Sequence, residues 1–74
     1  MWKNQKDGTI KTTLNGWTLI IDSERTNNQH WCRIARRSSL VGAQNHPTIE
    51  VAKSELETWA STHNYVGNGR IEKA

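Results

Sequence analysis

The chain has 74 residues, a formal net charge of +3 at pH 7, and a hydrophobic fraction of 34%. A domain of this length buries only about 60% of its unfolded surface, so we expect one small domain over residues 1–74. The single cysteine excludes an internal disulfide, and no apolar run approaches the roughly 20 residues that a membrane-spanning helix needs. We therefore expect a reduced, cytoplasmic setting without membrane contact.

The first regular element predicted is a β-hairpin over residues 9–22, preceded by a polar, flexible arm over residues 1–8. Asn15-Gly16 lies between two alternating runs and favours a two-residue turn, because both turn positions need φ > 0. The predicted cross-strand pairs are Leu14 with Trp17, Thr12 with Leu19, and Ile10 with Ile21. One apolar face results, formed by Ile10, Leu14, Trp17, Leu19 and Ile21. A slip of one residue would turn this face to water, so the register is well specified.

A third strand is predicted over residues 30–37, where the sequence alternates again. Its Trp, Cys and Ile side chains suit a half-buried pleated surface that returns antiparallel beside the second strand. The polar stretch 23–29 before it shows no periodicity and is expected to be a mobile connection. Residues 38–46 fit either a short extension of the sheet or a loop that Gly42 interrupts.

A helix is predicted over residues 48–63, because proline is favoured near a helix start and Thr48 can cap its free N–H groups. The apolar stripe recurs at helical spacing and consists of Ile49, Ala52, Leu56, Trp59 and His63, with Ala60 beside it. Residues 66–74 are expected to form a loose tail. The predicted fold is α+β: a three-stranded antiparallel sheet packed against one C-terminal helix, in the order β-β-β-α.

The sheet face opposite the helix is the candidate binding surface. If the third strand turns Cys32 and Ile34 inward, its Trp and Arg side chains point outward. The predicted contact residues are Trp31, Arg33, Arg37 and Lys11, with Ile20 as an apolar centre. Arginine and tryptophan are enriched where proteins bind partners, and cations with an indole also suit nucleic acid. The alternative is that Leu40-Val41 or the tail simply covers Trp31.

Catalytic and metal chemistry are not predicted. Zinc-binding residue types are present at His30, Cys32, His46 and His63, but the two later histidines lack a compact ligand spacing. We expect no metal site, and we expect Cys32 to be a small buried apolar residue. No nucleophile stands in a recognisable turn motif with a base, and the glycines form no phosphate-binding loop. The sequence thus predicts a protein that is not an enzyme and that uses no cofactor.

Two resemblances of pattern cover about residues 8–63. A short hairpin, a third strand with Trp-x-Arg and a helix reading TIEVAKSELETWA resemble small phage and prophage accessory proteins. Among those, anti-CRISPR proteins act by binding host machinery, which implies an inhibitor active in the host cytoplasm. The same pattern is similar to the three-stranded N-terminal DNA-binding domain of tyrosine-type integrases, whose sheet enters the major groove.

The leading hypothesis is a small non-enzymatic binding protein that docks on a larger macromolecule, either a host protein or a nucleoprotein complex. The resemblance to phage proteins implies an inhibitor of a host defence or nucleic-acid-processing complex. The alternative is a direct DNA- or RNA-binding module that uses the open sheet face. A third possibility is a dimerising module with Trp31 buried between two copies, so both monomer and homodimer stay open.

Overall fold

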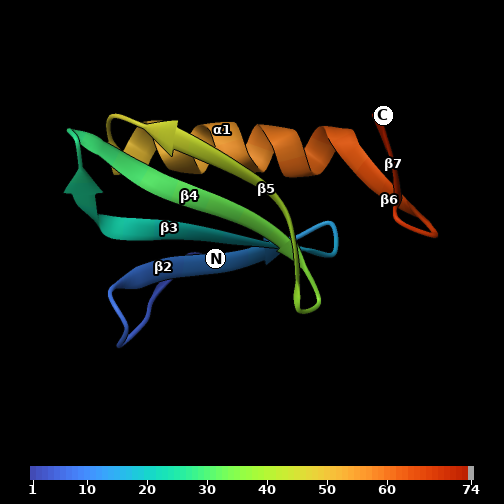
Figure 1. Cartoon of the computed structure of the whole chain (residues 1–74), viewed down its shortest axis with the longest axis horizontal. Coiled ribbons are helices and arrows are strands. Elements are labelled where there is room, and N and C mark those ends of the chain that lie inside the picture. Colours follow the sequence, from blue (N-terminus) through green and yellow to red (C-terminus); the bar gives the residue numbers. More distant parts are fainter. Residues whose placement is uncertain (74) are drawn as a thin grey trace.

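A computed structural model describes residues 1–73 of the chain (Figure 1). The elements are β1 (Lys3–Asn4), β2 (Thr9–Leu14), β3 (Trp17–Thr26), β4 (Gln29–Arg36), β5 (Ser39–His46), α1 (Ile49–Thr62), β6 (His63–Gly67) and β7 (Arg70–Lys73). The first five strands form an antiparallel sheet in the order β1-β2-β3-β4-β5. Helix α1 packs against one face of this sheet, and β6 and β7 form a separate two-stranded sheet beyond the end of the helix (Figure 1).

The predicted register of the first hairpin is confirmed. Leu14 pairs with Trp17, Thr12 with Leu19, and Ile10 with Ile21. Asn15 and Gly16 adopt φ values of +54° and +78°, as a two-residue turn of this kind requires. The apolar face is buried except at its turn end, where Leu14 is 37% exposed.

The core lies between this face of the sheet and α1. Trp17, Leu19 and Ile21 from β3 meet Cys32 and Ile34 from β4 and Ala52, Leu56 and Ala60 from the helix, all buried. Neither layer is stable alone, because a helix of about 15 residues and a lone hairpin are both marginal in water. Thr48 caps the helix, since its side chain accepts a hydrogen bond of 3.1 Å from the Val51 N–H. The apolar stripe of the helix is therefore what joins the two layers.

The prediction of a three-stranded sheet with one helix is wrong, because the main sheet has five strands and a second sheet follows the helix. The largest omission is β5, which pairs along β4 from Ser39 to His46. This edge strand mixes polar residues with a glycine and shows no regular apolar alternation. Hydrophobic periodicity therefore did not predict a strand here. A bulge near Val41 also shifts the pairing and interrupts the alternation.

The other differences are hairpins in stretches expected to be loose. Strand β3 continues to Thr26, and a turn at Asn27-Asn28, with φ values of +54° and +66°, leads directly into β4. The expected tail contains the hairpin of β6 and β7, whose turn includes Asn68-Gly69 at φ values of +53° and +76°. Asparagine tolerates the left-handed region better than most residues, which explains why these turns form. Residues 23–26, which lead into the first of these turns, are all polar, so that turn signal lacked its usual apolar context.

The expected arm is also tied to the rest of the molecule. Lys3 pairs with Lys11 as part of β1, and the indole N–H of Trp2 donates a hydrogen bond of 2.8 Å to the Glu57 carboxylate on α1. The N-terminal ammonium group of Met1 lies 3.2 Å from the hydroxyl of Thr12. The arm thereby adds a fifth strand at the edge beside β2.

Candidate macromolecule-binding surface

A row of side chains crosses all five strands on the face that α1 leaves open. The pairing places Lys3 beside Lys11, Lys11 beside Ile20, Ile20 beside Arg33, and Arg33 beside Ala43. We call these five residues the cross-strand row. Directly paired side chains in a sheet lie about 5 Å apart on the same face, so the row is a continuous strip. Lys11, Ile20 and Arg33, named from the sequence as contact residues, are thus brought together.

Trp31 lies on the same face, next to the row. Alternation along β4 puts it on the side of Arg33, and its side chain remains 43% exposed. The alternative that Leu40-Val41 or the tail covers Trp31 is therefore not what the structure shows, and Leu40 is itself 60% exposed. Cys32 and Ile34, the neighbours of Trp31 on β4, point the other way into the core. A large aromatic side chain that is not needed to fill the core is available for contact.

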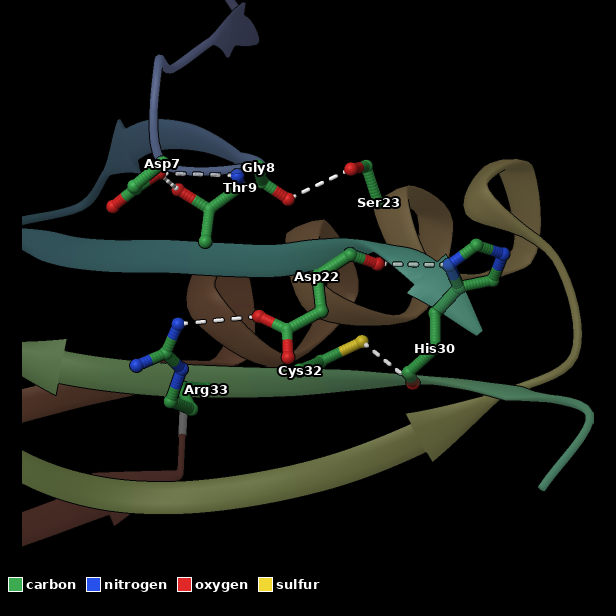
Figure 2. Close-up of polar contacts among 8 residues, drawn as sticks. All are labelled: Asp7, Gly8, Thr9, Asp22, Ser23, His30, Cys32 and Arg33. Carbon is green, nitrogen blue, oxygen red and sulfur yellow. Dashed lines mark hydrogen bonds and ion pairs between the residues drawn. The ribbon is translucent and has the colours of Figure 1, made fainter. Parts of the chain in front are cut away.

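Arg33 is held in place by its neighbours. Its guanidinium carbon lies 5.4 Å from the centroid of the Trp31 ring. Its Nη2 lies 3.3 Å from the Asp22 carboxylate on β3, as Figure 2 shows. Its Nε is buried without a hydrogen-bond partner in residues 1–73. Both side chains of the ion pair keep about a third of their surface exposed, 31% for Arg33 and 38% for Asp22. The result is a fixed cation beside an indole, with the strand pairing on either side setting its position.

Two hollows flank the row. One, of about 300 Å³, lies beside Trp31 and is lined by Asp22, Gln29 and Asn45 among others. The second, of about 420 Å³, lies at the opposite edge of the sheet and includes Lys3 and Lys11. Hydrogen-bonding groups therefore surround an apolar centre at Ile20, which is the usual layout of a protein interface.

Arg37 lies apart from the other predicted contact residues. Strand β4 ends at Arg36, and Arg37 occupies the following turn with a φ of +57°. It is exposed, but it is not part of the cross-strand row. The sequence placed it on the open face only by extending the strand one residue too far.

The surface also contains residues that the sequence did not single out as contacts. Lys3 extends the row because β1 pairs with β2. Asp22, where the pairing of β3 becomes irregular, forms an ion pair with Arg33. A strand of two residues has no periodicity that a sequence could display. The pairing of Asp22 with Arg33 depends on how β3 and β4 are aligned.

His30, Cys32 and His46 lie on the covered face of the main sheet. His30 and His46 are direct partners on β4 and β5, while His63 lies at the end of α1, stacked on Trp59 at a centroid distance of 4.2 Å. Among residues 1–73, no three His, Cys, Asp or Glu side chains are grouped so that they could hold a metal ion. Burial, helped by the nearby Asp22 carboxylate, raises the pKa of the Cys32 thiol to about 11. The thiol is thus protonated and unreactive near neutral pH.

Within the described residues, no helix is long and apolar enough to cross a membrane. When the chain is compared with protein-family models, with curated proteins and with solved structures, none of the three comparisons finds a match.

Proposed function

We propose that the protein is a non-enzymatic binding protein that docks on a larger macromolecule through the open face of its five-stranded sheet. The observation that supports this most is the cross-strand row, which aligns three cations with Ile20 in one strip beside the exposed Trp31. Aromatic and arginine side chains in the centre of a surface supply most of the binding energy in known interfaces.

The charge of the surface favours a protein or nucleoprotein partner over free nucleic acid. Arg33 is already paired with Asp22, so Lys3 and Lys11 are the cations of the row without such a partner in residues 1–73. Tight non-specific binding of nucleic acid depends on many phosphate contacts, and two free lysines provide few. An acidic protein surface with an apolar centre would match the row better.

A capture experiment with matched variants tests the proposal. The immobilised protein is exposed to extract of its native cells, and bound proteins are compared for Trp31→Ala and Arg33→Glu. The controls are Val51→Ala on the exposed side of the helix and Arg25→Glu at the far end of β3, both exposed positions outside the row. We expect one partner to be lost with the first two variants and kept with the controls. A partner that all four variants retain would contradict the proposal.

Direct binding of DNA or RNA is the second candidate, and the observation that favours it is Trp31 exposed beside a basic strip. A base could stack on the indole while the lysines contact phosphates. Fluorescence polarisation with random duplex and single-stranded oligonucleotides between 50 and 200 mM salt tests this. Nucleic-acid binding must weaken log-linearly over that range, and Lys11→Gln must reduce the salt slope by about one. A flat signal at the lowest salt removes this candidate.

Action as a phage-encoded inhibitor of a host defence complex, similar to anti-CRISPR proteins, stays a prediction, as does a cytoplasmic location. The choice between monomer and homodimer also stays open. Light scattering at micromolar concentration decides it, and a dimer abolished by Trp31→Ala would assign the open face to self-association.

A further inference from the structure

A second cationic site lies away from the cross-strand row, where β4 turns into β5. The Arg36 side chain projects to the covered side of the sheet, and its guanidinium carbon lies 4.3 Å from the Tyr65 ring centroid and 5.5 Å from that of Trp17. The two rings are arranged edge to face, with their centroids 6.4 Å apart. Stacking on aromatic rings restricts a guanidinium while leaving the N–H groups at its edge able to donate.

The first hairpin turn also lies against the Arg36 guanidinium group. A Cβ atom added to Gly16 would lie 2.7 Å from Nη1 of Arg36, which is closer than such atoms can approach. The absence of a side chain at Gly16 therefore makes room for the guanidinium. The Arg36 side chain is thus held by two segments that are distant in sequence: the first hairpin turn with the adjoining start of β3, and strand β6.

Within residues 1–73, this arginine has no anionic partner. The ion pairs within residues 1–73 join Arg33 to Asp22 and Arg70 to Glu72, and neither involves Arg36. Its side chain makes no hydrogen bond within the same residues, and its nitrogen atoms are not among the buried unsatisfied atoms. The N–H donors of Arg36 are thus fixed in position and reachable from solvent.

A hollow of about 350 Å³ opens at this position, lined by Arg36, Arg37, Ser38, Ser39, Val41 and Tyr65 among others. We call it the arginine pocket. It combines two guanidinium groups with the hydroxyl groups of two serines and a tyrosine, and none of the described residues that line it carries a carboxylate. Planar guanidinium forks and small hydroxyls are the donors that recognise phosphate oxygens, and the forks do so with two parallel hydrogen bonds.

We propose that the arginine pocket binds a phosphate group, with Arg36 as the preorganised donor and Arg37, Ser38 and Ser39 completing the contacts. The phosphate belongs either to a small phosphomonoester or to the phosphodiester backbone of a nucleic acid. The pocket shares no residue with the cross-strand row, so it is independent of the docking function proposed above.

An NMR titration of the whole protein with sodium phosphate tests this, with sodium chloride at equal ionic strength as the reference. We expect saturable shifts of the Arg36 Nε–H signal and of the Ser38 and Ser39 amides with phosphate alone. Arg36→Lys keeps the charge but removes the fork, so it should weaken binding about tenfold. The control is Arg70→Lys, an exposed arginine on β7 that does not line the pocket.

A second variant protects the test against loss of folding. Arg37→Asn removes a pocket charge at a φ of +57°, where asparagine is well tolerated, so the fold is retained while phosphate binding weakens. Equal shifts with phosphate and chloride, or equal weakening by Arg70→Lys and Arg36→Lys, would overturn the proposal. A short oligothymidine is titrated in parallel. Shifts of the same signals by the oligonucleotide assign the phosphate to nucleic acid, and their absence with phosphate binding intact assigns it to a phosphomonoester.

Discussion

Asn15 links the first hairpin to the end of the helix, and its replacement gives the sharpest test of how the fold is held. Its side-chain nitrogen Nδ2 lies 2.9 Å from the backbone oxygen of Ala60, 2.9 Å from that of His63, and 2.8 Å from Oδ1 of Asn64. The last carbonyl groups of a helix have no partner within the helix. Asn15 therefore has two roles, because it also adopts the positive φ that the hairpin turn needs.

Two substitutions separate these roles. Asn15→Gly keeps the turn conformation and removes the hydrogen bonds, each of which contributes about 0.5–1.5 kcal/mol in net terms. Since Nδ2 has two hydrogens, we expect a loss of about 1–3 kcal/mol in the free energy of unfolding. Asn15→Asp also tolerates the turn, but it places a carboxylate against carbonyl oxygens at the negative end of the helix dipole. We expect Asn15→Asp to be less stable than Asn15→Gly at pH 7.

Urea unfolding followed by tryptophan fluorescence measures both effects, and thermal melts supply an independent check. For a domain of this size, 1 kcal/mol corresponds to about 4–8 °C in Tm. The deficit of Asn15→Asp relative to Asn15→Gly should shrink below about pH 4, where the new carboxyl group gains a proton and can donate. If Asn15→Gly unfolds at the same urea concentration as the original chain, the contact between turn and helix contributes nothing and the reasoning fails.

Three further predictions concern the core and the titrating groups. Leu56→Ala, at a fully buried position, should lower the free energy of unfolding by about 2–5 kcal/mol in urea titrations, and a loss under about 1 kcal/mol would contradict the packing of α1 on the sheet. The pKa of the Cys32 thiol is about 11 in the folded state, against a reference value of 9.0. As the pH rises, the thiol therefore loses its proton in the unfolded chain first, and the free energy of unfolding should fall by up to about 3 kcal/mol between pH 9 and pH 11. Cys32→Ala should flatten that part of the stability profile, and an unchanged profile would assign the loss to other groups. The Thr9 hydroxyl donates a hydrogen bond of 2.6 Å to Asp7 and lowers the pKa of that carboxyl below 3.8. The ionised Asp7 carboxylate therefore contributes to the stability of the fold above pH 4, and this contribution is lost in more acidic solution. Melts of Asp7→Asn from pH 5 to pH 2 should show a weaker acid dependence, and a dependence as steep as in the original chain would exclude this cause.

The candidate surface could be located in part from the sequence. The hairpin register and the alternation of residues 30–36 put Lys11, Ile20, Trp31 and Arg33 on the face away from the helix, which is where they lie. Lys3 could not be predicted as part of the surface, because it joins the row through a strand of two residues. Arg37 was misplaced because no residue pattern around it indicates that the chain turns immediately after Arg36.

The amino-acid sequence by itself determined the Asn15-Gly16 hairpin, its pairing, and the helix with its buried stripe. These features depend on residues within about twenty positions of one another, where turn chemistry and apolar periodicity act directly. Tertiary structure alone decided that residues 39–46 join the sheet and that Arg36 is seated between Trp17 and Tyr65. An edge strand takes its conformation from its neighbour rather than from its own pattern, and a stacked arginine needs rings brought together from two distant segments.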